Sequence, residues 1–120
     1  MHTVVETPSF IAAAKSASMT DPVRADVVTA IAENPMIGEV MEGTGGFRKF
    51  RFARPGGGKS GGFRIVSYFH SEGMPAFLIT VFGKSQKANL SKQERNELAK
   101  LSAILIATYA AQLGKKDETR

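Results

Sequence analysis

Three β-type segments follow one another in the middle of the chain, and only short turns separate them. "FRKFRFAR" alternates between apolar and basic side chains, "FRIVSYFH" follows after a glycine-rich turn, and "AFLITVFG" is apolar almost throughout. Alternation predicts a strand with one buried face, whereas a continuous apolar run predicts a strand covered on both faces. Consecutive strands joined by short turns pair antiparallel. The chain is therefore expected to fold around a mainly antiparallel sheet.

The segments before this sheet predict one short strand and two helices. The β-branched residues of "HTVVET" favour an opening strand, and the alanine-rich segment 9–18 favours a helix. A second helix is expected to begin at Asp21, which would serve as its N-cap, and to end before Pro35. The following "GEVMEGTGG" is expected to be a loop or a short edge strand.

The C-terminal part predicts one long helix from about Ser91 to Leu113. Ser91 followed three residues later by Glu94 is a capping-box pattern. Gly114 and the polar tail after it predict the end of the helix. Apolar residues recur within it at helical spacing. This expected stripe consists of Leu98, Leu101, Ile104 and Leu105.

The order of these elements predicts an α+β fold. A small, mainly antiparallel sheet would pack against two N-terminal helices and carry a C-terminal helix. The chain has 120 residues, which fits one domain over residues 1–120. No apolar run reaches the ~18 residues of a membrane span, and the start lacks the basic region of a signal peptide. No cysteine is present. These features predict a cytoplasmic protein.

The turn "RPGGGKSGG", from Arg54 to Gly62, has the look of a nucleotide-binding loop. Such a loop needs a second glycine five residues before the glycine of its Gly-Lys-Ser, and Ala53 stands at that position. It must also open a helix, whereas a strand pattern follows here. The segment is therefore predicted to be a hairpin connection, in which the glycines supply positive φ angles.

Basic residues are concentrated in this region. The formal net charge is +5, and no acidic residue lies between Glu42 and Glu72. A cationic segment of this kind indicates a polyanion as partner. Its basic residues are Arg48, Lys49, Arg51, Arg54, Lys59 and Arg64.

The strand period divides these charges between two faces. Lys49 and Arg51 would point away from the face that carries Phe50 and Arg48. Pairing with the next strand would bring Lys49 and Arg51 near Arg64. The cluster is either a solvated basic face or an anion site. We favour a phosphate site, because like charges repel and arginine donates bidentate hydrogen bonds to phosphate.

The segment "GTGGFRKFRFARPGGGKSGGFRIVSYF", followed by "LITVFGKSQKANLSKQE", resembles the RelE/HigB-type toxins of bacterial type II toxin–antitoxin systems. It is most similar to the HigB-like subgroup with the signature "GGxRKxRxxxxGxGKSGGxR", and the resemblance covers residues 39–101 in detail. It implies a RelE-like fold and a ribosome-dependent, metal-independent endoribonuclease (an mRNA interferase) that cuts mRNA in the ribosomal A site. In that reaction the 2′-hydroxyl attacks the neighbouring phosphate and expels the 5′-oxygen.

The resemblance also implies roles for individual residues. Arg64 matches the strand arginine that stabilises the phosphate, and Lys49 and Arg51 match a basic pair that supplies a base or a phosphate clamp. Lys84 matches the basic position after the last strand, which gives the catalytic set Lys49, Arg51, Arg64 and Lys84. The residues expected to bind RNA around it are Arg48, Arg54, Lys59 and Lys87.

The sequence departs from the family at two positions. Ser85 replaces an arginine, and Ser91 stands approximately where the family has a tyrosine. Tyr68 and His70 are expected on the same strand face as Arg64 and are the auxiliary candidates for the missing tyrosine, although such residues more often belong to the core or the surface. No metal site is expected, because the two histidines lie far apart and lack an acidic cluster at ligand spacing.

The resemblance implies a cognate antitoxin of the helix-turn-helix type. The toxin would associate with operator DNA only through this antitoxin. The ribosome and mRNA are the other expected partners, with no cofactor and no membrane. Two further functions stay open. The missing tyrosine is compatible with a non-catalytic module that binds RNA, the ribosome or the antitoxin. ParE-like members of the superfamily inhibit gyrase instead, so fold alone does not decide the activity.

Overall fold

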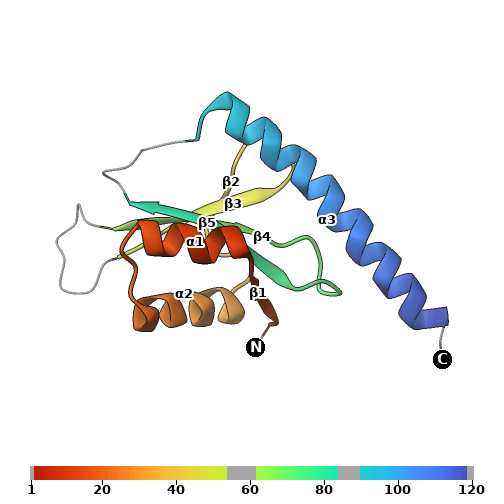
Figure 1. Cartoon of the computed structure of the whole chain (residues 1–120). Helices are drawn as coiled ribbons and strands as arrows, with labels where there is room; N and C mark the ends of the chain where they lie inside the picture. The colour runs from red at the N-terminus through yellow and green to blue at the C-terminus, as the bar shows by residue number, and fades with distance from the viewer. Residues whose placement is uncertain (1, 54–61, 84–89, 119–120) are drawn as a thin grey trace.

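The structure, a computed structural model, describes residues 2–53, 62–83 and 90–118, with side chains as far as residue 108. The five strands described form one sheet in the order β1-β5-β4-β3-β2. Helices α1 and α2 lie on one side of this sheet and α3 lies on the other (Figure 1). The expected α+β class is confirmed. Along the chain the elements are β1 (Val4–Glu6), α1 (Pro8–Ser16), α2 (Asp21–Glu33), β2 (Glu39–Val40), β3 (Phe47–Phe52), β4 (Phe63–Tyr68), β5 (Ala76–Gly83) and α3 (Lys92–Glu118).

The sheet is mainly antiparallel, as expected. Strands β2, β3, β4 and β5 pair antiparallel in sequence order, whereas β1 pairs parallel with β5. The register between β4 and β5 shifts once, between Val66 and Ser67. Segment 38–46 supplies the two-residue strand β2 at the edge, so the expectation of a short edge strand is confirmed.

Strand β5 lies between β1 and β4 and contributes to the core on both faces of the sheet. Leu78 packs with Phe10 and Ile31 from α1 and α2. Phe77, one residue earlier, packs on the opposite face, where α3 contributes Leu101. This double burial is why "AFLITVFG" lacks the alternation of a half-exposed strand, and the expectation for β5 is confirmed.

Threonines cap both N-terminal helices. The Thr7 hydroxyl accepts from the Phe10 N–H at 3.2 Å, and the Thr20 hydroxyl accepts from the Val23 N–H at 3.4 Å. Asp21 as N-cap was therefore wrong: Thr20 has the extended backbone of a cap and places Asp21 in the first turn. Helix α1 runs over Pro8–Ser16 rather than 9–18. The second helix ends before Pro35, as predicted.

Helix α3 begins as predicted but differs in its apolar face and its end. In the capping box, the Glu94 carboxylate accepts from the Ser91 N–H at 2.9 Å, and the Ser91 hydroxyl accepts from the Glu94 N–H at 3.1 Å. Ile104 is 60% exposed, whereas Ile106 packs on the core. At 3.6 residues per turn, Ile104 lies about 120° from Leu98 and Ile106 only about 80°.

The predicted end of α3 at Gly114 was also wrong, because the helix continues to Glu118. A glycine inside a helix costs only about 1 kcal/mol relative to alanine, so it does not by itself stop a helix. The lysines that follow Gly114 favour helix.

Candidate functional site

Arg51 of β3 and Arg64 of β4 are direct cross-strand partners. Lys49, two residues before Arg51, lies opposite Val66 of β4. Since side chains alternate between faces, Lys49, Arg51 and Arg64 share the face that also carries Val66. Strand pairing therefore brings these three basic residues together, as the alternation predicted.

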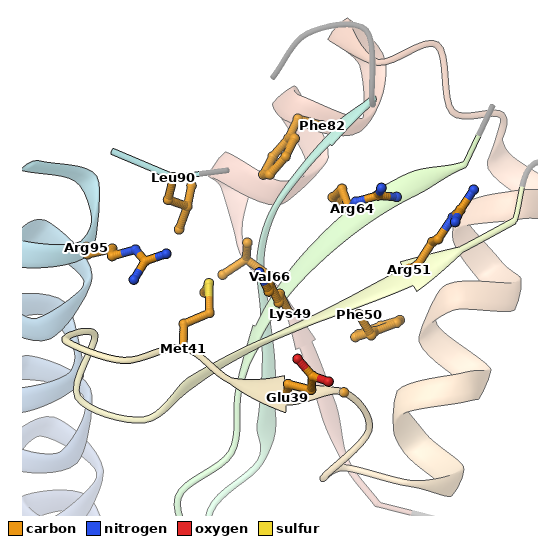
Figure 2. A pocket seen from close by; sticks show the side chains of 11 residues that line it. Glu39, Met41, Lys49, Phe50, Arg51, Arg64, Val66, Phe82, Leu90 and Arg95 are labelled. Carbon is orange, nitrogen blue, oxygen red and sulfur yellow. The ribbon is translucent and has the colours of Figure 1, made fainter. Parts of the chain in front are cut away.

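These residues line a pocket of about 580 Å³ on the α3 side of the sheet (Figure 2). This volume is in the range typical of small-ligand sites. The basic side chains come from β3 and β4, and Arg95 approaches from α3. Glu39 and Gly38 lie at the edge formed by β2. The apolar part of the lining consists of Met41, Phe50, Val66, Phe82 and Leu90.

Arg64 carries an unsatisfied donor in this pocket. Its side chain is half-buried, and its Nη1 atom is buried without a hydrogen-bond partner among the residues that the structure describes. A buried polar group without a partner costs about 1–3 kcal/mol, and more when it is charged. An anion held by Arg64 would remove that cost through charge-assisted hydrogen bonds. The arrangement is therefore suited to a phosphate between Arg64 and its cross-strand partner Arg51.

Arg48 lies on the other face of β3 and does not line the pocket. Its Nη1 donates to the carbonyl oxygens of Met36 at 3.0 Å and of Gly38 at 3.3 Å. These bonds hold the turn that leads into β2, so Arg48 supports the edge of the site. Four other predicted site residues lie outside the described residues, namely Arg54, Lys59, Lys84 and Lys87.

Tyr68 and His70 do not reach this pocket. Tyr68 shares the sheet face of Arg64, but it lies four residues along the strand, about 13 Å away. It is 1% exposed, its ring packs on Phe47 with centroids 4.6 Å apart, and burial raises its pKa above the ordinary value. His70 is exposed and follows the end of β4 at Tyr68, so its expected place on that strand was wrong. Ser91, which the resemblance set approximately at the family's tyrosine, caps α3 with its hydroxyl.

The sequence analysis did not predict two charged residues of the pocket lining, Arg95 and Glu39. Arg95 lies one residue after the capping box and donates from Nη1 to the Glu42 carbonyl oxygen at 3.4 Å. Glu39 stands opposite Lys49 in the pairing of β2 with β3. The capping box could have fixed the position of Arg95 on its helix, but no local pattern places that helix beside β2.

The turn between β2 and β3 holds one wall of the pocket in place. The buried Thr44 hydroxyl donates to the Met41 carbonyl at 2.7 Å and accepts from the Phe47 N–H at 3.1 Å. The Met41 N–H in turn donates to the Phe47 carbonyl at 2.8 Å. These bonds fix Met41, whose side chain lines the pocket.

Within the described parts of the chain, no group of three or more histidine, aspartate or glutamate side chains is placed to hold a metal ion. Of the helices that the structure describes, none combines the length and apolar character of a membrane span. One protein-family model matches residues 3–119, and its description is "RelE toxin of RelE / RelB toxin-antitoxin system".

Proposed function

Because the chain belongs to the RelE toxin family, we propose that it is an endoribonuclease that cuts mRNA in the ribosomal A site. Membership of the family makes it a toxin of a toxin–antitoxin system with a cognate antitoxin as partner. The proposed reaction places its action in the cytoplasm, where ribosomes translate mRNA. The antitoxin is proposed to be of the helix-turn-helix type, as the HigB-like resemblance implies.

The observation that carries this proposal is the buried Nη1 atom of Arg64, which has no hydrogen-bond partner in the described part of the chain and lies on the strand beside Arg51. The proposed reaction forms a bond from the 2′-oxygen to phosphorus and breaks the bond from phosphorus to the 5′-oxygen. Negative charge gathers on the phosphoryl oxygens in the transition state, where fixed cationic donors stabilise it most. Arg64 and Arg51 are suited to that task.

The proton transfers need a base and an acid. Lys49 lies next to the arginine pair on the same face and is proposed to accept the 2′-hydroxyl proton or to clamp the phosphate. Lys84 is proposed to supply a further cation, as the resemblance implies. No cofactor takes part in the proposed reaction, which also needs no metal ion.

The test is to express the wild type, Arg64→Ala and Lys15→Ala, each with an inducible promoter, and to map mRNA ends by primer extension. Lys15 is an exposed cation on α1, outside the pocket, and serves as the matched control. The wild type and Lys15→Ala should cut within translated codons and arrest growth. Arg64→Ala should do neither while keeping the circular dichroism of the wild type. Full toxicity of Arg64→Ala, or DNA damage without mRNA cuts in the wild type, contradicts the proposal.

A second candidate is a non-catalytic toxin that binds the ribosome or its RNA. It is favoured by one observation: the described pocket lining contains no histidine, the commonest group for proton transfer, and no tyrosine. This candidate predicts growth arrest and salt-sensitive co-sedimentation with ribosomes, but no new mRNA ends.

A further inference from the structure

Arg95 differs from the other basic residues of the described pocket lining, because it comes from α3 and not from the sheet. It lies near the start of the helix and is half-buried. Its Nη1 donates to the neutral Glu42 carbonyl oxygen at 3.4 Å, and no ion pair joins it to a residue that the structure describes. No acidic residue stands three or four positions away on the helix, where it could pair with Arg95. No carboxylate therefore compensates this charge within the described chain.

The pocket carries more positive charge than one phosphate neutralises. Four basic side chains and one carboxylate belong to its described lining, namely Lys49, Arg95, the arginine pair Arg51 and Arg64, and Glu39. None of the four cations forms an ion pair with a described residue. The carboxylate and one bound phosphodiester carry one negative charge each, so two positive charges remain. Because neighbouring cations repel one another, this surplus indicates a ligand with further negative charge.

Arg95 and the arginine pair lie at different places in the pocket. Glu42, which Arg95 contacts, directly follows Met41, and the Met41 N–H donates to the Phe47 carbonyl of β3. Arg51 lies four residues beyond Phe47 on the same strand, which is about 13 Å at the rise of a β-strand. Figure 2 agrees with this offset, because it shows Arg95 on the α3 side and the guanidinium groups of the arginine pair away from it.

A strand of RNA suits this arrangement, because it carries a phosphate at every nucleotide. With one phosphate at the arginine pair, another phosphate of the same strand can reach the start of α3. Lys49, two residues before Arg51 on the same face, lies along the way. The guanidinium group of Arg95 has five N–H donors, of which the described residues engage only one nitrogen. The remaining donors are available for a bidentate bond to phosphate.

We propose that Arg95 binds a second phosphate of the RNA strand, apart from the phosphate held by the arginine pair. Arg95 is then a binding residue and not a catalytic one, since it does not touch the reacting phosphate. The RNA strand would lie against both the sheet and the start of α3. This inference rests on the proposed function, since RNA supplies the strand.

The test compares a ligand that has one phosphate with a ligand that has several. The first is inorganic phosphate. The second is a 2′-O-methyl uridine tetranucleotide, which lacks the reacting hydroxyl and so cannot be cut. Calorimetry at several salt concentrations measures their binding to the purified wild type, Arg64→Ala and Arg95→Gln.

The two variants should separate the two phosphates. Arg64→Ala should weaken the binding of both ligands. Arg95→Gln should weaken only the tetranucleotide, by about tenfold or more, the effect of losing a hydrogen bond to a charged group. In Arg95→Gln, the slope of the logarithm of the binding constant against the logarithm of salt concentration should fall by about 0.7, the contribution of one phosphate contact on a single strand.

Two further variants separate a direct contact from a general charge effect. Lys100 is an exposed cation of α3 outside the pocket, and it lies about 140° around the helix from Arg95. Lys100→Gln removes the same charge and should leave the affinity and the salt slope near those of the wild type. Arg95→Lys keeps the charge, so it should keep the slope but lose part of the affinity, because lysine cannot form the bidentate bond.

Several results would overturn the inference. They are tetranucleotide binding by Arg95→Gln that equals the wild type, a loss no larger than that of Lys100→Gln, or no binding of the tetranucleotide by the wild type. An equal loss for inorganic phosphate would mean that one phosphate contacts Arg95 and the arginine pair together. An unchanged salt slope with a lower free energy of unfolding in urea would give Arg95 only the structural role of holding Glu42.

This inference and the proposed function fail in different ways. If the wild type cuts mRNA but Arg95→Gln binds the tetranucleotide normally, the second phosphate contact is wrong and the proposed function stands. If tetranucleotide binding depends on Arg95 but no mRNA is cut, the contact stands and the proposed reaction is wrong.

Discussion

Gly45 of the β2–β3 turn lies directly against Ser102 of α3, so closely that a Cβ atom on the glycine would collide with the Ser102 hydroxyl. Ser102 is buried, and its hydroxyl donates to the Ala99 carbonyl at 2.7 Å within the helix. The turn carries Met41 into the pocket and the helix carries Arg95. This one close approach therefore sets how two walls of the pocket meet.

Replacing Gly45 with alanine should destabilise the fold by about 2–4 kcal/mol. The φ angle of Gly45 is 77°, where a side chain costs about 1–2 kcal/mol, and the collision with Ser102 adds the cost of overpacking. Urea denaturation measures the loss. Gly43→Ala is the matched control, since Gly43 has the same φ of 77° but nothing within 4 Å of the added Cβ. Equal losses in both variants would mean that contact with α3 plays no part.

Thr44→Val should cost about 1–3 kcal/mol, because it preserves the shape of a buried side chain but removes its hydroxyl. The Phe47 N–H would lose its acceptor, and the Met41 carbonyl would lose a donor. Thr44→Ser keeps the hydroxyl and should recover most of that loss. The measurements are the free energy of unfolding and the hydrogen-exchange rate of the Phe47 amide. A Thr44→Val protein with wild-type exchange at Phe47 would contradict the role given to the hydroxyl.

Arg51→Gln should make the protein slightly more stable and less able to bind RNA. Like charges on direct cross-strand partners destabilise a sheet by roughly 0.2–1 kcal/mol, and Arg51 lies opposite Arg64. The gain should shrink as salt is added, because salt screens exposed charges. Thermal unfolding at low and high salt tests this, with Lys15→Gln on α1 as the control. If Arg51→Gln is less stable than the wild type at low salt, repulsion between Arg51 and Arg64 does not destabilise the fold.

The sequence predicted those parts of the fold that depend on local patterns. Alternation assigned Lys49 and Arg51 to one face of β3, and the capping box located the start of α3. Local patterns also caused the errors. Asp21 and Thr20 are both good caps, and only the observed backbone decides between them. Ile104 fits a helical repeat, but the sheet contacts a face centred elsewhere.

The site was predicted only on the two adjacent strands, β3 and β4, that carry its basic residues. Lys49, Arg51 and Arg64 belong to adjacent strands, so pairing alone brings them together. Glu39 and Arg95 come from an edge strand and a helix that are distant in the chain, and tertiary packing alone places them in the pocket. Tyr68 shows the reverse case: the period assigned its face correctly, but nothing local revealed that Phe47 covers it.

Tyr68→Phe should leave RNA cleavage intact and change the alkaline limit of stability. Burial raises the pKa of the Tyr68 phenol above 10.0 in the folded chain, so the folded state disfavours the phenolate. The stability linked to this shift is complete below the unfolded pKa of about 10 and is lost as the pH rises through the folded pKa. The phenylalanine variant lacks this group and should lose less stability above pH 10. Unfolding free energies measured from pH 8 to pH 11 test this. If a folded Tyr68→Phe protein no longer cuts mRNA at neutral pH, Tyr68 is a functional residue after all.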